Sequence, residues 1–326
     1  MKKIIFSLTA AFFVICGIIY FPQLQRKHTP KVSVAVIIYN RINYIEECLE
    51  SILKQNIDKE IILADDHSTD GTFEYLQRFQ EKHPEVKLYQ TPQNSGTVIN
   101  RYNAMKHATG DYLIFVDADD ALIPESLPKL YKMARNQKAD ILEFDIASDD
   151  EKQSYRPLKL QNAAKFENNI LESYDNRFIS NSLANKLFSK KLYTTVLSKI
   201  NPKIKQPNFS DVVFYLYHFL LNAENVVQSD IVGYFYYTRR GMTSRLSNVD
   251  ALKNYVGFAV TKKEIEKVYG PLESLEKTYR TACNQALNEY TLLSAEDKKT
   301  YLPELYKLMS KDRVEQYLRE NEDEKQ

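Results

Sequence analysis

One stretch decides the fold of this chain: Tyr-Leu-Ile-Phe-Val-Asp-Ala-Asp-Asp, residues 112–120. Its five apolar, partly β-branched residues predict a buried strand. The three carboxylates that follow are not explained by packing, because unpaired charge is costly to bury. Asp117 and Asp119 are spaced so that they can share one hard cation, often together with a substrate's phosphates. A solvated acidic turn is the alternative when this motif is taken alone.

The overall composition bounds the class of protein. With 326 residues the chain is long enough for a catalytic domain of roughly 200–250 residues and an extension. Lys and Arg total 44 and Asp and Glu total 43, so no net field favours nucleic acid as a partner. The three cysteines (Cys16, Cys48 and Cys283) are widely spaced and odd in number, which indicates neither a disulfide framework nor a zinc site.

The N-terminus stands apart in composition. Residues 4–21 are almost entirely apolar, follow Lys2 and Lys3 and end at Pro22. As a helix these residues would rise about 27 Å, just enough to span a bilayer. We favour a retained anchor, residues 1–30, over a cleaved signal peptide, because no small-residue cleavage site precedes the basic stretch. A slight excess of positive charge downstream favours a catalytic domain in the cytoplasm.

After this segment, strand and helix patterns alternate at short intervals, which is typical of a parallel α/β sheet. Strands are expected at residues 32–38, 61–63, 86–89 and 112–116, with amphipathic helices between them. The second strand ends in Asp65 and Asp66. Turn and helix-cap chemistry would explain one acidic residue there, but not two adjacent ones.

The pattern loosens beyond Asp120. We expect a strand at 141–146, mainly helix over 158–200 and strands over 226–237. From residue 250 almost everything reads as amphipathic helix. The predicted organisation is a domain over 31–245, divided into halves at 31–125 and 126–245, and a helical extension over 246–326 that could form a homodimer.

A series of short motifs occurs in order over about 95 residues: Val32–Asn40 ending in Tyr39-Asn40, Asp65–Thr72, Asn94–Gly96, Arg101, Gly110–Tyr112 and Phe115–Asp120. Together and at this spacing they resemble the nucleotide-sugar half of family 2 glycosyltransferases. The resemblance implies the GT-A fold, a Rossmann-like, mostly parallel sheet with flanking helices.

The resemblance also implies roles for individual residues. Asp66 would hold the nucleotide base, with Asp65 shaping the same loop, and Asp119 would bind the Mn²⁺ or Mg²⁺ that bridges the diphosphate. Asp117 would contact the ribose or the metal. Arg101 would support Asp66 or a phosphate, and Tyr39 belongs to the same donor-binding set.

The acceptor side carries fewer motifs. The family's catalytic base is an Asp before a helix, and Asp211 lies at the matching place; its plain alternative is a carboxylate favoured by the helix dipole. Ser210 departs from the Glu that usually precedes this Asp. Arg239 and Arg240 follow a predicted strand and could reach the diphosphate when a loop closes, or form a basic surface turn.

These features predict a metal-dependent inverting glycosyltransferase. The resemblance further implies that it moves a sugar from a nucleotide donor, UDP-linked in our expectation, to a glycan or lipid-linked acceptor, in capsule or lipopolysaccharide biosynthesis at the bacterial inner membrane. A processive synthase is disfavoured because it would carry several spans and a Trp motif, and the chain has no Trp. A nucleotidyltransferase would need a Gly-rich phosphate loop after the first strand, where residues 39–43 contain no glycine. A non-catalytic, membrane-tethered scaffold is the alternative from another class.

Overall fold

The computed structural model describes residues 30–150, 165–166, 170–175, 179–204, 211–238, 240 and 247–323. The expected anchor segment, residues 4–21, lies outside this part of the chain. Among the described residues, no helix is both long and apolar enough to cross a membrane.

The described residues form one nine-stranded sheet in the order β3-β2-β1-β4-β8-β6-β9-β5, with β7 paired to β9. Its strands are β1 (Val32–Ile38), β2 (Lys59–Asp65), β3 (Lys87–Gln90), β4 (Tyr112–Asp117), β5 (Ala121–Leu122), β6 (Ile141–Ser148), β7 (Lys165–Phe166), β8 (Lys186–Ser189) and β9 (Val226–Tyr236). The apolar runs that predict β1, β2, β3, β4 and β6 are therefore confirmed within one or two residues at most ends.

The sheet is mixed, which corrects the expectation of a mostly parallel sheet. The first four strands, from β3 to β4, are parallel. β8 then runs antiparallel to both β4 and β6, and β5 and β7 run antiparallel to β9. The interpretation of residues 158–200 as mainly helical is wrong at β8. Four residues are too few to show a strand period, and the apolar pair Leu187 and Phe188 fits a helix equally well.

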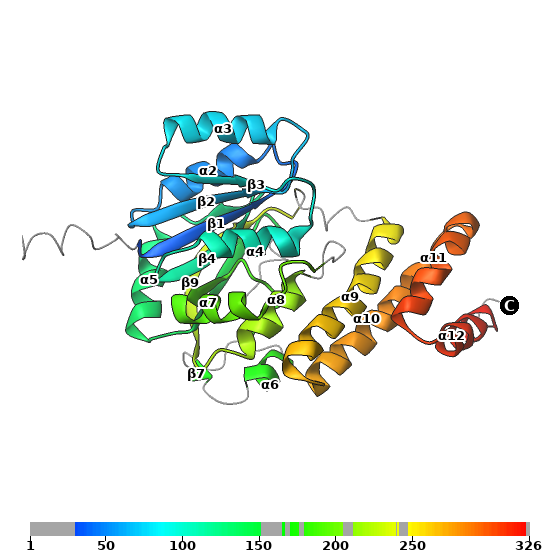
Figure 1. Cartoon of the computed structure of the whole chain (residues 1–326). Helices are drawn as coiled ribbons and strands as arrows, with labels where there is room; N and C mark the ends of the chain where they lie inside the picture. Colours follow the sequence, from blue (N-terminus) through cyan, green and yellow to red (C-terminus); the bar gives the residue numbers. More distant parts are fainter. Residues whose placement is uncertain are drawn as a thin grey trace, which may run out of the picture.

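Helices cover both faces of the sheet (Figure 1). They are α2 (Ile45–Leu53), α3 (Thr72–Lys82), α4 (Thr97–His107), α5 (Ser126–Asn136), α6 (Ile170–Asp175), α7 (Lys190–Lys199), α8 (Asp211–Leu220), α9 (Asn248–Tyr269), α10 (Glu273–Thr291), α11 (Ala295–Leu308) and α12 (Lys311–Asp323). Alternate residues of a strand point to opposite faces, so β1 feeds two cores. Ala35 and Ile37 pack with α4, α7 and α8, whereas Val34 and Val36 pack with α2 and α5.

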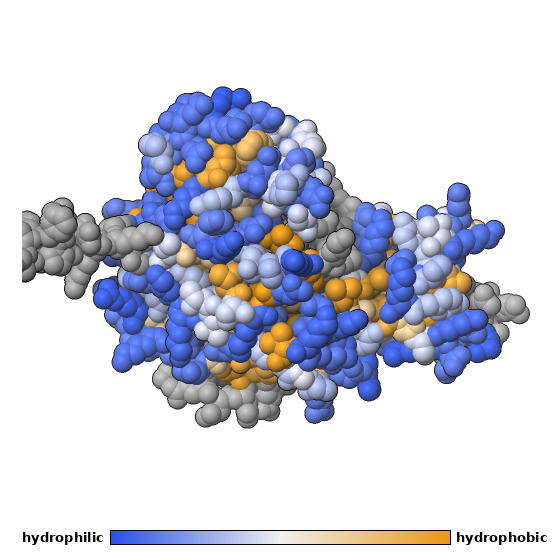
Figure 2. All heavy atoms as spheres, in the orientation of Figure 1, coloured by the Kyte–Doolittle hydropathy of each residue, from blue (hydrophilic) through white to orange (hydrophobic). Residues whose placement is uncertain are grey.

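Of the C-terminal helices, α9 and α10 contact α8, and α11 and α12 lie farther from the sheet (Figure 1). Phe258 and Ile265 of α9 join the core that contains α8, while the outer helices share a small core of their own around Leu287 and Leu305. On the face drawn in Figure 2, apolar residues gather between the sheet and these helices, and hydrophilic residues cover most of the remaining surface.

This topology determines where the acidic motifs meet. β1 lies between β2 and β4 and is parallel to both, with Ile38 opposite Asp65 and Ile37 opposite Asp117. The carboxyl ends of the three strands therefore share one edge of the sheet, which is where open α/β sheets bind ligands.

Candidate active site

A cavity of about 200 Å³ lies at this edge, and most of the predicted site residues line it. Its walls include six of them: Tyr39, Asp66, Arg101, Asp117, Asp119 and Asp211. The lining comes from β1, β4 and the residues that directly follow β1, β2 and β4, together with α4, α8 and the end of β9. Residues far apart in the sequence thus face a single space.

Arg101 of α4 links the two halves of the cavity. Its Nε donates to Oδ2 of Asp211 at 2.7 Å, and its Nη2 donates to Oδ1 of Asp117 at 2.9 Å. Arg101 and Asp211 are each 5% exposed, whereas the side chain of Asp117 is 41% exposed. Burial alone would lower the pKa of Arg101, but the two carboxylates raise it above its usual range. The guanidinium therefore stays charged.

The resemblance implies that Arg101 supports Asp66 or a phosphate. In the structure its carboxylate partners are Asp117 of β4 and Asp211 at the start of α8, not Asp66. Asp211 makes no other hydrogen bond within the described part of the chain, so its Oδ1 remains available as an acceptor.

Three carboxylates crowd the end of β4. Burial, opposed by Arg41, raises the pKa of Asp119. Burial and the neighbouring Asp117 and Asp119 raise the pKa of Asp120 to about 8. Asp120 accepts hydrogen bonds from the Tyr234 hydroxyl at 2.8 Å and the Tyr237 amide at 3.0 Å, which tie it to β9. Asp120 lines the cavity together with Asp117 and Asp119, but both of its carboxylate oxygens are already bound by the protein.

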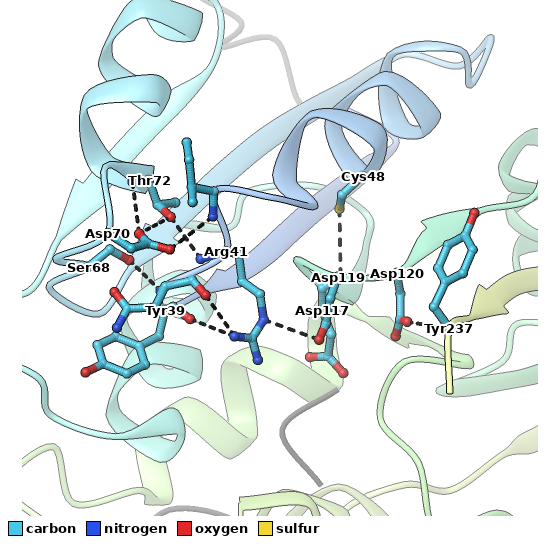
Figure 3. A network of polar contacts seen from close by, with 12 residues as sticks. Tyr39, Arg41, Cys48, Ser68, Asp70, Thr72, Asp117, Asp119, Asp120 and Tyr237 are labelled. Carbon is cyan, nitrogen blue, oxygen red and sulfur yellow. Dashed lines mark hydrogen bonds and ion pairs between the residues drawn. The ribbon is translucent and has the colours of Figure 1, made fainter. Parts of the chain in front are cut away.

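Arg41 is a cavity residue that sequence reasoning missed. It follows Tyr39-Asn40 directly after β1, and its Nε lies 3.2 Å from Oδ2 of Asp119 (Figure 3). A cation immediately after the first strand, on the edge shared with an acidic strand end, is the signal that could have found it.

Asp65 and Asp66 hold the surrounding loops. Asp65 is fully buried and accepts hydrogen bonds from Ser68 and Gln90. Asp66 accepts from the Thr91 hydroxyl at 2.8 Å and from two loop amides, Ser95 N at 2.8 Å and Gly96 N at 2.7 Å. Glycine suits the last position because its φ of +84° is unfavourable for residues with a Cβ. Of these two carboxylates, only that of Asp66 reaches the cavity.

Two buried oxygens on α4 have no hydrogen-bond partner within the described residues. They are Thr97 Oγ1 and Asn100 Oδ1, and both residues line the cavity. The amide nitrogen of Asn100 donates to the carbonyls of Ala64 and Ile38, which fixes the orientation of its oxygen. Unsatisfied buried acceptors are costly, so a ligand that presents N–H or O–H groups would complete them.

Of the basic pair after β9, Arg240 is described and does not line the cavity. Arg240 donates to Oε2 of Glu47 on α2 at 2.6 Å and stacks on the Tyr237 ring at 3.6 Å. The hydroxyl of Tyr237 donates to the same carboxylate. Arg239 lies outside the described residues.

The carboxylates at the end of β4 could hold a divalent cation only together with other ligands. Within the described residues, no group of three or more His, Cys, Asp or Glu side chains could hold a metal ion. Asp117 and Asp119 supply two carboxylates. This number fits Mg²⁺ or Mn²⁺ that is bound together with substrate phosphates and water, rather than in an all-protein cage. The donor set therefore fits a cation that arrives with a diphosphate.

The comparisons with known proteins agree with this architecture. The sequence profile described as "Glycosyl transferase family 2" matches residues 33–197, just over half of the chain. A cholesterol galactosyltransferase of Borreliella burgdorferi is 28% identical over 69% of this chain and 64% of its own length. A poly(ribitol-phosphate) beta-glucosyltransferase of Bacillus spizizenii is 36% identical over 34% of this chain and 18% of its own length. The chain thus spans less than two thirds of the length of either relative.

A solved structure shares the fold. S. aureus TarS, residues 1–349, in complex with UDP-GlcNAc, superposes with a TM-score of 0.62 at 23% identity, covering 88% of this chain and 83% of that one. The structure thus has a GT-A-like α/β fold with a mixed sheet and flanking helices. On the strength of the profile match, this chain belongs to glycosyltransferase family 2.

Proposed function

We propose that this protein is an inverting glycosyltransferase that uses a nucleotide sugar, most simply a UDP-sugar, and a divalent cation. The observation that carries the proposal is the pair of hydrogen bonds from Arg101 to Asp211 and Asp117 within one cavity. One guanidinium thus contacts both Asp211, the proposed base for the acceptor, and Asp117, which lies where the diphosphate would bind.

In the proposed reaction, the oxygen of an acceptor hydroxyl attacks the anomeric carbon of the donor sugar. The bond from that carbon to the phosphate oxygen breaks, and the nucleoside diphosphate leaves with the electron pair. Asp211 accepts the hydroxyl proton as general base. Arg101 holds the Asp211 carboxylate in place, and because only Oδ2 is engaged, Oδ1 can receive the proton.

The other end of the cavity would hold the leaving group. Asp117 and Asp119 would bind Mn²⁺ or Mg²⁺, which when present acts as a Lewis acid for the diphosphate. Thr97 and Asn100 would accept hydrogen bonds from the nucleoside, and Asp66 keeps the loop beside it closed through Ser95 and Gly96. The UDP-GlcNAc bound by TarS supports the choice of UDP.

For the acceptor we propose a glycan or a lipid. The names of the two relatives, a cholesterol galactosyltransferase and a poly(ribitol-phosphate) beta-glucosyltransferase, support acceptors of both kinds. Family membership favours sugar transfer over a nucleotidyltransferase or a scaffold. We also propose that residues 4–21 anchor the enzyme at the inner membrane, a role supported by their apolar composition.

The direct test is a screen of nucleotide sugars with Mn²⁺, using wild type and Asp119→Ala. Wild type is expected to hydrolyse or transfer at least one sugar in a metal-dependent manner, and Asp119→Ala is expected to lose both this activity and metal-dependent donor binding. Background rates with every common nucleotide sugar would favour the scaffold instead.

A further inference from the structure

The loop after β1 holds Arg41 in a fixed place. The Arg41 amide donates to Thr72 Oγ1 at 2.9 Å, and the neighbouring Asn40 amide donates to Ser68 Oγ at 2.9 Å (Figure 3). On the other side, the Ile42 amide donates to Asp70 Oδ2 at 3.2 Å. Three consecutive amides are therefore tied to the loop after β2, which leaves the Arg41 backbone little freedom.

The side chain is held as well. Nη1 of Arg41 donates to the carbonyl of Tyr39 at 3.2 Å and to that of Asn40 at 2.9 Å, while Nε pairs with Asp119 at 3.2 Å. The Arg41 side chain is 15% exposed and that of Asp119 is 9% exposed. Nη2 has no partner within the described residues, although Arg41 lines the cavity. A guanidinium nitrogen thus remains available to a ligand.

The charges around Asp117 and Asp119 distinguish Arg41 from Arg101. Each of two cavity carboxylates has one arginine partner, Arg101 for Asp117 and Arg41 for Asp119. The two pairs are not equivalent, because Arg101 is also bound to Asp211, whereas Arg41 binds only one carboxylate in the described part of the chain. A divalent cation on Asp119 would meet the Arg41 guanidinium at close range, where like charges repel.

We propose that Arg41 is an exchangeable counter-ion for Asp119. In the nucleotide-free enzyme it neutralises this carboxylate and keeps cation affinity low. When the nucleotide sugar brings the cation, the cation takes the place of Arg41 on Asp119, and the guanidinium binds the diphosphate through its fork of donors. This inference rests on the proposed function, and it adds that the cation and the donor bind together rather than cation first.

The test measures Mn²⁺ binding by electron paramagnetic resonance on the full chain, first without nucleotide and then with UDP. Arg41→Gln is compared with wild type and with Arg78→Gln, which removes an exposed arginine on α3 away from the cavity. We expect Arg41→Gln to bind Mn²⁺ alone on the order of tenfold more tightly, because a positive charge beside Asp119 is removed. We expect it to bind Mn²⁺–UDP on the order of tenfold more weakly, because one charge-assisted contact to the diphosphate is lost. Arg78→Gln should match wild type in both.

Opposite shifts in the two affinities would distinguish the proposed role of Arg41 from damage to the loop, because such damage would lower both affinities. Arg41→Lys keeps the charge and is expected to retain the low nucleotide-free affinity of wild type, with circular dichroism confirming the fold of each variant. An unchanged or lowered Mn²⁺ affinity of Arg41→Gln without nucleotide overturns the inference. Asp119→Ala tests the underlying assignment separately: if it still binds Mn²⁺ with UDP as wild type does, the proposed metal role of Asp119 fails whatever Arg41 does.

Discussion

Nε of Arg101 lies 2.7 Å from Oδ2 of Asp211, although 110 residues separate the two in the chain. This bond joins α4, which lies between β3 and β4 in the chain, to the first residue of α8. It holds Asp211 at the cavity through one carboxylate oxygen, Oδ2. Nη2 of Arg101 can therefore bind Asp117 at the same time.

Removal of Arg101 should therefore affect both stability and activity. Arg101→Gln leaves two carboxylates without their partner, and we expect it to lower the free energy of unfolding by roughly 3–5 kcal/mol, as for other buried pairs broken on one side. Arg101→Lys keeps the charge but not the planar fork, so it should restore more stability than activity. Urea unfolding and steady-state transfer rates check both; equal recovery of the two by lysine would contradict the positioning role.

The unpartnered hydroxyl of Thr97 provides a test of nucleoside binding. Thr97→Val keeps the shape of the side chain and removes a buried oxygen that has no partner in the described residues. We expect unchanged or slightly higher thermal stability, together with a donor Kd raised about fivefold, which corresponds to one lost hydrogen bond of about 1 kcal/mol. Calorimetric titration with the donor measures the second effect, and an unchanged Kd would remove Thr97 from the binding site.

His218 on α8 should make the stability depend on pH. Burial and Lys199 lower its pKa from 6.5 to about 4, and its Nδ1 lies 2.8 Å from the Tyr269 hydroxyl on α9. Between these two pH values the unfolded chain binds the proton and the folded chain does not. Stability is therefore fully present above about pH 6.5 and is lost on acidification, by up to about 1.4 kcal/mol per pH unit.

This slope is isolated by comparing variants, because other groups titrate in the same range. The difference in unfolding free energy between wild type and His218→Gln should shrink steadily from pH 7 to pH 4.5. His83→Gln, at a partly exposed histidine, serves as the matched control and is measured over the same pH range. Parallel curves for wild type and His218→Gln would show that His218 is not held neutral.

A second buried pair joins two neighbouring strands of the sheet. Lys186 on β8 contacts Glu143 on β6 at 3.1 Å, with both side chains fully buried, and Glu143 also accepts from the Ser180 amide and Gln228. Burial raises the pKa of Glu143, but Lys186 and these donors bring it below its usual range.

We expect Lys186→Met to cost roughly 3–5 kcal/mol, because it strands a buried carboxylate. Lys186→Met combined with Glu143→Gln should cost clearly less than the two single changes added together, since no unpaired charge remains. Chemical denaturation of the four proteins in this cycle gives the coupling energy. Simple additivity would mean that the pair contributes nothing beyond packing.

The strands that form the site could be read from the sequence because their apolar runs are long and end abruptly. β1, β2 and β4 each carry such a run, and the parallel arrangement of these strands brings Asp66, Asp117 and Asp119 to one edge. β8 could not be found in this way. It is short, and the charge of its buried Lys186 is matched by Glu143 on the neighbouring strand, a contact that no local pattern contains.

The sequence also could not predict which charged side chains pair with each other in the cavity. Arg101 binds Asp211 and Asp117 rather than Asp66. Its partners depend on the direction in which α4 crosses the strand ends. Asp66 is already occupied by the amides of Ser95 and Gly96. Arg41 was missed although it follows β1 closely, because its position in the sequence does not say which carboxylate at this edge it binds.

The most direct measurement is the single-turnover rate of sugar transfer by Asp211→Asn, taken with its donor affinity. Asparagine preserves the size of the side chain and can still lie beside Arg101, but it cannot take a proton. We predict a rate about 10²–10⁴-fold below wild type, with Mn²⁺-dependent donor binding retained. A variant that transfers sugar at the wild-type rate would contradict the assignment of Asp211 as the base.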